Sequence, residues 1–420
     1  ATLLKALHRY NCVTVHFDHT LAAVEQPDGG RVIAHIEHQE AVRDMSARFV
    51  IGADGASSTV RRLLGISMEG DSFEQRWLVV DTEGDEDNSF DTVAYCDHRR
   101  PAISLPGPGG TRRWELLLDR AESDEVALEP GWIDPVLESL GATPPRQIVR
   151  TAVYAFHARI AQRWREGSVF LLGDAAHLSP PYAGQGMNSG IRDAANLGWK
   201  LCCVLDGTMD ESALASYESE RKPHAEAMIQ LALRIGRVMT PKSALQSYGR
   251  AAFFHLATAV PAVKRYLIEM RFKPKPKFES GLLVPDGISN TMVGRMLPQP
   301  LVGQASGAPV LLDDVLGPGY SLIRFGTPFP SYPDQVFKGI EALPLRILPP
   351  DCRPMAADNW IEVRDEGGLS KRLSQYADRV LLVRPDRYVA GSFTDDEAER
   401  FASRFRHLLG PSTSRIQESH

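Results

Sequence analysis

The clearest hydrophobic pattern of the chain lies in residues 168–205, where an apolar run, a turn, a loop and a periodic segment follow one another. Residues 169–172 are continuously apolar and end at Gly173, which is typical of a strand buried on both faces. Beyond the loop, apolar side chains recur at steps of three and four residues, which predicts a helix that ends at Gly207. We expect its buried face to comprise Met187, Ile191, Ala194, Ala195, Gly198, Leu201, Cys202 and Leu205, with Asn188, Arg192, Asn196 and Lys200 on another face.

The loop between this strand and this helix concentrates the candidate chemistry. It offers one carboxylate, two stiffening prolines and small residues that let the backbone approach a ligand closely. The amide groups at the start of the helix attract electron-rich groups. We therefore expect a ligand site built from Gly173, Asp174, Pro180, Pro181, Gly184, Gly186, Met187 and Asn188.

A second apolar run breaks at a glycine-containing turn within residues 48–61, which read RFVIGADGASSTVR. Asp54, Gly55 and Arg61 are its candidate functional residues, and Ser58 stands where the cap of a short helix would stand. Taken alone, this segment is equally consistent with a plain turn followed by a capped helix.

Shorter patterns complete the prediction of secondary structure. Strand-like runs occupy residues 77–80, 91–95, 114–118 and 148–154, and a glycine-rich turn is predicted at 107–110. Towards the C-terminus, residues 378–391 read as a strand, a turn and a second strand, and residues 397–409 suit a helix.

Together, the two glycine-containing segments resemble those of the FAD-dependent aromatic-ring monooxygenases, the single-component flavoprotein hydroxylases with the p-hydroxybenzoate hydroxylase fold. GDAAH, followed by PP-x-x-G-Q-G-M-N and GIRDAANLGWKL, is similar to that family's second FAD-binding motif. Asp54, Gly55, Ser58 and Arg61 match its D-G-x-x-S-x-x-R segment. The resemblance implies FAD as cofactor, with Asp174 on the ribityl chain and residues 180–188 along the flavin ring.

The resemblance also implies an α/β fold with several domains. Residues 1–66 and 166–207 form the Rossmann-like FAD-binding domain, and residues 67–165 form an inserted β-sheet domain that binds substrate. Residues 208–307 form a helical region and linker, and residues 308–410 form a thioredoxin-like domain. That last domain has no C-x-x-C, so we expect it to serve packing or formation of a homodimer rather than dithiol exchange.

One feature that the family implies is missing from the chain. Relatives carry G-x-G-x-x-G in a first βαβ unit, and this string occurs nowhere in the 420 residues. The chain begins with Ala1 and reaches the D-G turn by residue 54. We therefore expect the FAD-binding domain to be N-terminally truncated, and we assign activity to the complete protein.

Composition and charge narrow the range of partners. The chain is 43% hydrophobic and can bury one or two substantial cores, and it has no run of about eighteen apolar residues that could span a membrane. A net charge of −6 argues against nucleic acid or an anionic membrane as the principal partner. The cysteines show no metal-binding spacing, so we expect no metal site and reduced thiols in a cytoplasmic protein: Cys12, Cys96, Cys202, Cys203 and Cys352.

Within the family, the run FHARIAQRWREGSVFLLGDAAH most resembles hydroxylases of 3-(3-hydroxyphenyl)propionate. This implies a small phenolic acid as substrate, with NADH or NADPH reducing FAD. O₂ would then add at the flavin C4a position, and the hydroperoxide would transfer oxygen ortho to the phenol hydroxyl. Two other interpretations stay open: hydroxylation of a polycyclic, antibiotic-type aromatic compound, and a non-catalytic fragment that binds no FAD.

Candidate substrate contacts follow from the chemistry of a phenolic acid, in which an arginine pairs with the carboxylate and a histidine or tyrosine contacts the phenol. His157 and Arg159 alternate on a strand-like segment, and Tyr182 lies in the flavin loop. Arg76 is a second choice, and His177 is interpreted as structural support for the loop. The alternative is that Arg159 forms a surface ion pair and His157 fills the core.

Overall fold

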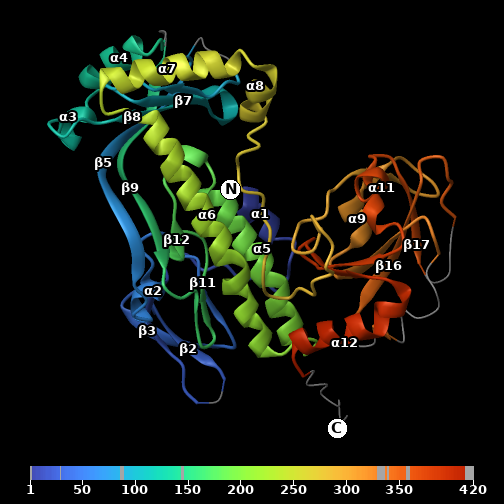
Figure 1. The fold of residues 1–420 in the computed structure, drawn as a ribbon. Coiled ribbons are helices and arrows are strands. Elements are labelled where there is room, and N and C mark those ends of the chain that lie inside the picture. Colours follow the sequence, from blue (N-terminus) through green and yellow to red (C-terminus); the bar gives the residue numbers. More distant parts are fainter. Residues whose placement is uncertain are drawn as a thin grey trace. The chain divides into compact units, whose positions relative to one another are not determined.

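The computed structural model describes residues 2–28, 30–85, 89–142, 146–328, 336–337, 340–355 and 360–411 (Figure 1). The chain divides into two compact units. The first consists of Ala1–Asp87 and Arg113–Pro181, and the second of Asn88–Arg112 and Tyr182–His420.

The first unit is built largely from antiparallel strands. The short helix α1 (Thr2–Leu7) precedes a three-stranded sheet of β1 (Thr20–Glu25), β2 (Val32–His38) and β3 (Ala41–Ala47), in that order. A second antiparallel group has the order β12 (His177–Leu178), β9 (Gln147–Ala161), β5 (Met68–Glu83) and β8 (Thr111–Leu117). Two short helices lie between β8 and β9: α3 (Asp124–Ala127) and α4 (Pro130–Ser139).

A small sheet in the first unit contains the two glycine-containing segments singled out from the sequence. Its order is β10 (Arg165–Glu166), β11 (Val169–Leu171) and β4 (Val50–Gly52), and β11 runs parallel to β4. All three residues of β11 are buried, as the continuous apolar run predicts. The helix α2 (Thr59–Leu63) follows β4 through the D-G turn.

The strand predictions for the insertion are largely confirmed. Residues 77–80 lie in β5, residues 114–117 in β8 and residues 148–154 in β9. The second unit contains β6 (Val93–Tyr95), which covers the last part of the predicted 91–95 run, and β7 (Ala102–Pro106), with which β6 pairs antiparallel. The predicted glycine-rich turn leads from β7 into β8 through the short 3-10 helix η1 (Pro108–Gly110).

Helices dominate the central part of the second unit. They are α5 (Gly186–Leu205), α6 (Ser216–Met239), α7 (Ala244–Thr258) and α8 (Pro261–Ile268), with the 3-10 helix η4 (Glu211–Ala215) leading into α6. None of the helices in the described part of the chain combines the length and apolar character that a bilayer span needs.

The last part of the second unit is a seven-stranded sheet with helices, in the order β14 (Val310–Leu311), β13 (Leu301–Gly303), β17 (Ile361–Asp365), β16 (Ala342–Leu348), β15 (Tyr320–Phe325), β18 (Val380–Val383) and β19 (Val389–Phe393). The central β15, β16 and β17 are parallel, whereas β18 and β19 form the antiparallel pair expected from residues 378–391. The short helices α9 (Leu312–Leu316) and α11 (Leu369–Arg372) precede β15 and β18, and α12 (Ala398–Leu409) follows a capping box between Thr394 and Glu397.

The buried face of α5 differs from the one that its periodicity predicts. The helix itself is confirmed, but Met187, Ile191 and Leu205 are exposed. Its buried residues are Ser189, Asp193, Asn196, Leu197, Lys200, Leu201 and Val204. Leu201 is the one member of the predicted face that is buried. The rest of the prediction was wrong because apolar spacing ranks residues by hydrophobicity alone, whereas buried polar groups are tolerated when they are paired.

Candidate functional site

Both predicted cofactor segments emerge at the same edge of one small sheet. β4 leads into Asp54 and Gly55, and β11 leads into Gly173 and Asp174. Because β4 and β11 are neighbouring parallel strands, their carboxyl ends lie side by side. This edge is where open α/β sheets place their ligands, so the pairing turns two separate sequence motifs into parts of one site.

Asp54 organises the start of α2. Its carboxylate accepts a hydrogen bond from the Val60 amide at 3.0 Å, and the Ser58 hydroxyl caps the same helix by accepting from the Arg61 amide at 3.0 Å. Burial alone would raise the pKa of Asp54. The hydrogen bonds from Ser58, Val60 and Thr59 outweigh burial, so its pKa lies below the ordinary value. Both the plain-turn interpretation and a role in shaping the site therefore describe Asp54.

Arg61 ties the two segments together. Its guanidinium donates one hydrogen bond to the carbonyl oxygen of Ala56 and another to that of Ala175, each at 2.9 Å. The side chain is buried, and burial together with the nearby cations Arg62 and Arg159 lowers its pKa despite the attraction of Asp54. Arg61 thus fixes the D-G turn against the residue that follows Asp174.

Asp174 is an exposed carboxylate in the 3-10 helix η2 (Gly173–Ala175). In the described part of the chain, no hydrogen bond or ion pair occupies that carboxylate, although the backbone on both sides of it is fixed. Leu172 donates to the Gly52 carbonyl at 3.0 Å, and Ala175 accepts from Arg61. A carboxylate held in this way can accept hydrogen bonds from ligand hydroxyls.

His177 occupies a structural position directly after the segment that carries Asp174. It is buried in β12, and its ring stacks on Trp164 with centroids 5.2 Å apart. This position agrees with the structural role expected from the sequence. The loop continues through Pro180, which is buried, and Pro181, which opens the 3-10 helix η3 (Pro181–Ala183).

The second unit, described by itself, contains the start of α5. Gly184 has a φ of 58°, in the left-handed region that favours glycine, and a side chain at Gly184 or Gly186 would meet no atom within 4 Å. No side chain caps the first turn of α5, which contains Met187 and Asn188, both exposed. The open amides of this turn suit an electron-rich ligand group.

Tyr182 lies at the entry to this helix and packs closely on α6. A Cβ atom at Gly236 would come within 2.6 Å of the Tyr182 ring, so the glycine makes room for the tyrosine. Tyr182 is half-buried. The structure therefore places it against α6, within the loop where the sequence placed it.

His157 and Arg159 both lie on β9, two residues apart, and so share one face of the strand. Arg159 pairs with Gly70 of β5 on one side and with Leu178 of β12 on the other, which brings it next to the strand that leaves the Asp174 loop. The buried Nε atom of Arg159 has no hydrogen-bond partner in the part of the chain that the structure describes. It is the candidate cation of this face.

Arg76, the second-choice substrate contact predicted from the sequence, already has partners within the protein. Its guanidinium pairs with Asp124 and donates to the carbonyl oxygens of Glu122 at 2.5 Å and Asp119 at 3.3 Å. These contacts fix the segment that enters α3. Arg76 is therefore a structural residue of the insertion.

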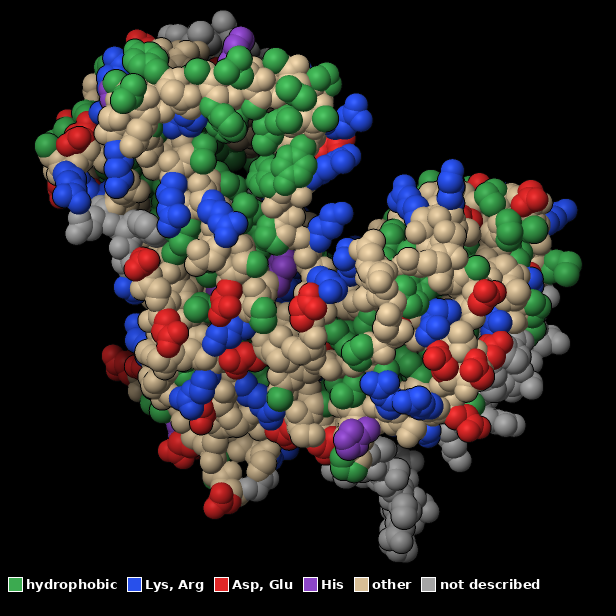
Figure 2. All heavy atoms as spheres, viewed as in Figure 1, with side chains coloured by type: hydrophobic (Ala, Val, Ile, Leu, Met, Phe, Trp, Pro, Cys, Tyr) green, Lys and Arg blue, Asp and Glu red, His purple; other side chains and the backbone are tan. Residues whose placement is uncertain are grey.

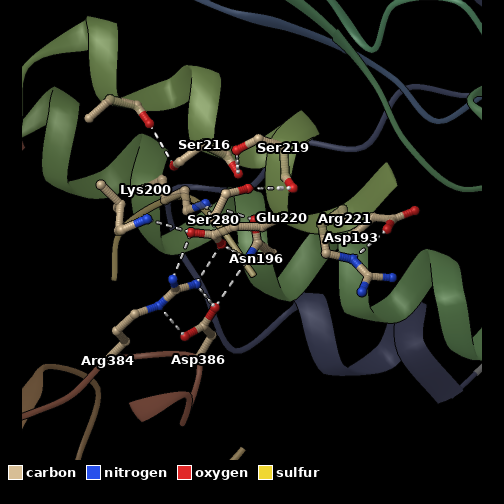
Figure 3. A network of polar contacts seen from close by, with 12 residues as sticks. Asp193, Asn196, Lys200, Ser216, Ser219, Glu220, Arg221, Ser280, Arg384 and Asp386 are labelled. Atoms are coloured by element: carbon tan, nitrogen blue, oxygen red, sulfur yellow. Dashed lines mark hydrogen bonds and ion pairs between the residues drawn. The ribbon is translucent and has the colours of Figure 1, made fainter. Parts of the chain in front are cut away.

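A buried polar cluster beneath α5 escaped the sequence analysis (Figure 3). Glu220 of α6 accepts two hydrogen bonds from Arg384, at 2.7 and 2.8 Å, and one from Lys200 of α5 at 2.8 Å. Asp386 accepts from the same Arg384 guanidinium at 2.6 and 3.0 Å. The two cations and two carboxylates connect α5 and α6 to the turn between β18 and β19.

The charges of this cluster stabilise one another. Burial would raise the pKa of Glu220, but Arg384 and Lys200 outweigh it and hold that pKa far below its ordinary range. Burial lowers the pKa of Lys200 to about 8, although Glu220 opposes the shift. Asn196 adds a hydrogen bond to Glu220 at 2.7 Å. The polar spacing of Asn196 and Lys200 was the sequence signal, but it does not reveal that Glu220 of the next helix and the distant Asp386 are the partners.

A second buried pair holds α5 nearer to its start. Arg221 of α6 donates to Asp193 at 2.9 Å and to the carbonyl oxygen of Ser189 at 3.4 Å, and all three residues are buried (Figure 3). Ser189 lies in the first turn of α5, so Arg221 fixes the helix end that carries the open amides.

Comparisons with known proteins agree on the family. Residues 1–232 match the family model described as FAD binding domain, and residues 294–408 match that of the HcaD C-terminal domain. The chain is 37% identical over 405 residues to a 3-(3-hydroxy-phenyl)propionate/3-hydroxycinnamic acid hydroxylase of Mycolicibacterium gilvum (strain PYR-GCK), covering 93% of this chain and 70% of the relative. A protein of the same name from Burkholderia cenocepacia (strain HI2424) is 37% identical over 403 residues, covering 93% and 74%.

Solved structures show the same fold. The flavin-dependent monooxygenase PieE, in complex with FAD and substrate, superposes with a TM-score of 0.78 at 21% identity, over 97% of this chain and 78% of that one. Aklavinone-11 hydroxylase, in a ternary complex with FAD and aklavinone, gives a TM-score of 0.70 at 23% identity, over 94% and 74%.

The residues present fit the cofactor of this family. FAD brings ribityl hydroxyls that need acceptors and an electron-rich ring edge that needs N–H donors. Considered by itself, the first unit has such an acceptor in the Asp174 carboxylate. The second unit, considered by itself, has such donors at the glycine-containing loop and the uncapped helix start at Gly186. With the family model spanning more than half of the sequence and relatives above one-third identity, the chain belongs to the family of FAD-dependent aromatic hydroxylases.

Proposed function

We propose that this protein hydroxylates a phenolic aromatic acid of the 3-(3-hydroxyphenyl)propionate class, ortho to the phenol hydroxyl, with NADH or NADPH as reductant. The names of the sequence relatives support this substrate class. The solved structures, at 21% and 23% identity, support the fold but give no support for a polycyclic substrate.

Bound FAD would supply the redox chemistry by accepting hydride from the nicotinamide and activating O₂. The chain's own residues would hold it: Asp174 as acceptor for the ribityl hydroxyls, and the amides from Gly184 to Asn188 as donors to the ring edge. Arg61 contributes by keeping the Asp174 loop fixed against the D-G turn. A fixed loop lets the cofactor bind without further ordering.

The observation that carries the substrate proposal is Arg159. A cation whose buried Nε lacks a partner is costly, and a bound carboxylate would satisfy it through charge-assisted hydrogen bonds. Arg159 therefore serves as the anchor for the propionate group of the substrate.

His157 is the residue we assign to the phenol. A phenol has a pKa near 10, and its electron-rich phenolate form is favoured by a base or a cation close by. His157 shares the strand face of Arg159, so one substrate with a carboxylate and a hydroxyl at opposite ends can address both. Tyr182 is the alternative contact for the hydroxyl.

Turnover by the protein loaded with FAD tests the proposal. NADH and NADPH oxidation would be followed with 3-(3-hydroxyphenyl)propionate, with the matching alcohol that lacks the carboxylate, and with a polycyclic phenol. We expect the acid to stimulate oxidation most and to yield a catechol, identified by mass and NMR. Preference for the polycyclic phenol would overturn the substrate class. A protein that retains no FAD would support the non-catalytic interpretation.

A further inference from the structure

Four charged side chains are enclosed where α5 and α6 meet the turn between β18 and β19. Those of Lys200, Glu220 and Arg384 have no exposed surface, and that of Asp386 is 3% exposed. Figure 2 shows that Lys, Arg, Asp and Glu side chains elsewhere are spread over the visible face of the molecule, in contact with solvent. Apolar side chains of similar shape often stabilise a fold as well as a buried ion pair does. The buried cluster therefore calls for a role beyond stability.

The Glu220 carboxylate is the centre of this cluster. Its Oε1 atom accepts hydrogen bonds from Arg384 at 2.7 Å and from the Leu282 amide at 2.9 Å. Its Oε2 atom accepts from Arg384 and Lys200, each at 2.8 Å, and from Asn196 at 2.7 Å. Because these donors come from separate segments, the carboxylate fixes one arrangement of all of them. A buried polar network that is satisfied in this way specifies a unique packing.

Arg384 holds this arrangement from the C-terminal side. Its guanidinium carbon lies 5.2 Å from the ring centres of Trp199 and Phe278, and the same guanidinium also donates to Asp386. Arg384 belongs to the region that matches the HcaD C-terminal domain, whereas Glu220 belongs to the region that matches the FAD binding domain. A planar guanidinium that donates two parallel hydrogen bonds transmits both distance and direction. The pair therefore connects the two matched regions in a defined orientation.

The next residue of α6, Arg221, extends this connection to the start of α5. It is fully buried and donates to Asp193 at 2.9 Å and to the Ser189 carbonyl oxygen at 3.4 Å (Figure 3). Glu220 and Arg221 are consecutive in a helix, so a displacement of one displaces the other. Their partners on α5 recur at steps of four, three and four residues and form one face of that helix: Ser189, Asp193, Asn196 and Lys200.

We propose that Arg384 is a positioning residue for the cofactor: through Glu220 and Arg221 it fixes the first turn of α5. This inference rests on the proposed function, in which the amides of that turn donate to the flavin ring. Amides at a helix start favour the negative charge that a flavin ring gains on reduction. Loss of the fixed geometry should therefore weaken FAD binding and make the bound flavin harder to reduce.

The alternative is that the cluster only adds stability. Any equal loss of stability in the C-terminal region would then have the same effect on α5. Val363→Ala provides the matched control, because it leaves a cavity in the core around β17, which β16 and β15 separate from β18. Chemical denaturation establishes that each variant is folded and how much stability it has lost.

Hydrogen exchange of the full chain, followed by mass spectrometry, tests the first step without any cofactor. Arg384→Lys keeps the charge but loses the two parallel hydrogen bonds to Glu220, so the amides of residues 189–193 should exchange about tenfold faster. In Val363→Ala, this segment should exchange at the rate of the unaltered protein. Unchanged exchange in Arg384→Lys would overturn the inference and leave the proposed function standing.

Two further variants keep this test decisive. Arg221→Met removes the last contact of the connection and should reproduce the faster exchange at residues 189–193. Asp386→Asn removes only the charge beside Arg384, so it should give a smaller increase in the same segment. It replaces Arg384→Lys if that variant does not fold, and unchanged exchange in Asp386→Asn would then overturn the inference.

Titration with FAD and the reduction potential of the bound flavin test the second step. In Arg384→Lys the FAD dissociation constant should rise about tenfold and the potential should become more negative, as weaker stabilisation by the helix start predicts. Val363→Ala should change neither. Equal changes in both variants would make Arg384 a residue of stability alone. Faster exchange without any change in FAD affinity or potential would refute the contact between α5 and the flavin, and with it this inference. A chain that binds no FAD would refute the proposed function, while the exchange rates would still decide whether Arg384 positions α5.

Discussion

The guanidinium of Arg61 donates a hydrogen bond to the carbonyl oxygen of Ala175 at 2.9 Å, although 114 residues separate the two. This contact joins the D-G turn to the loop that presents Asp174. The strands that precede these two segments, β4 and β11, are also paired. Backbone pairing and the buried Arg61 side chain therefore both hold the loop in place. The position of the candidate ribityl ligand thus depends on a residue that need not touch the cofactor.

Replacing Arg61 should weaken cofactor binding through the loop. Arg61→Met leaves the Ala175 and Ala56 carbonyls without their donor, which should lower the free energy of unfolding by about 1–3 kcal/mol. We expect FAD affinity to fall about tenfold as the loop loses its fixed position. Arg62→Met is the control, because Arg62 is exposed and, among the described residues, its side chain bonds only Thr59 on its own helix. Fluorescence titration with FAD and thermal melting measure both effects, and equal losses in the two variants would contradict this role.

Substitution of Asp174 should affect FAD binding, whereas substitution of Asp54 should affect the stability of the fold. Asp174→Asn removes an unoccupied, exposed carboxylate, so stability should change little while FAD affinity drops by about 2 kcal/mol, the typical worth of a hydrogen bond to a charged group. Asp54→Asn should instead cost about 1 kcal/mol of stability, because Asp54 accepts from the Val60 amide at the start of α2. Chemical denaturation beside FAD titration distinguishes the two; a destabilised Asp174→Asn would show that the carboxylate has a structural partner.

The sequence was sufficient where short-range pattern decides structure. The buried run of β11, the helix α5 and the β18–β19 pair all follow from local periodicity and turn residues. Glycine, proline and aspartate likewise marked the loop that follows β11, while its contact with flavin stays a prediction. What could not be read was the adjacency of β4 and β11, since strand pairing across more than a hundred residues leaves no local signal.

The largest error of the sequence analysis was the predicted buried face of α5, and the polar contacts of that helix show the physical reason. Lys200 and Asn196 score as surface residues on any hydrophobic scale, yet both are buried because Glu220 accepts hydrogen bonds from both and Asp386 accepts one from Asn196. Glu220 lies 20 residues from Lys200 on the next helix, and Asp386 lies 190 residues from Asn196. A single sequence cannot predict such a pairing, so the polar side of the helix was placed outward.

Arg159 should control substrate binding without affecting the cofactor. Arg159→Gln keeps a hydrogen-bond donor but loses the charge, so KM for a phenolic propionate should rise about tenfold to a hundredfold, as loss of a charge-assisted pair predicts. The matching alcohol should be turned over equally by both proteins, and FAD affinity should be unchanged. Steady-state kinetics with both substrates provide the measurement. An equal loss with acid and alcohol would assign Arg159 to the fold.

The Glu220–Arg384 pair should be a major contributor to stability. Arg384→Met leaves Lys200 as the cation beside Glu220 and removes two hydrogen bonds to Glu220 and two to Asp386, which should cost about 3–5 kcal/mol. Arg163→Met breaks a largely exposed pair with Glu166 and should cost less than about 1 kcal/mol. Denaturant unfolding compares the two, and similar small losses would mean that the cluster contributes little net free energy.

Glu220 also predicts how stability depends on pH. Arg384 and Lys200 hold its folded pKa below the ordinary value of 4.5, so above that pH both the folded and the unfolded chain carry the ionised group and its stabilisation is complete. As the pH falls below 4.5, the unfolded chain takes up the proton first and the free energy of unfolding declines. Glu220→Gln has no titrating carboxyl group at this position. Its free energy of unfolding should therefore fall less steeply between neutral and acid pH than that of the unaltered protein. Other carboxylates with lowered pKa, such as Asp365, titrate in both proteins and cancel in the comparison. Parallel slopes in urea titrations across this range would show that Glu220 is protonated equally in both states.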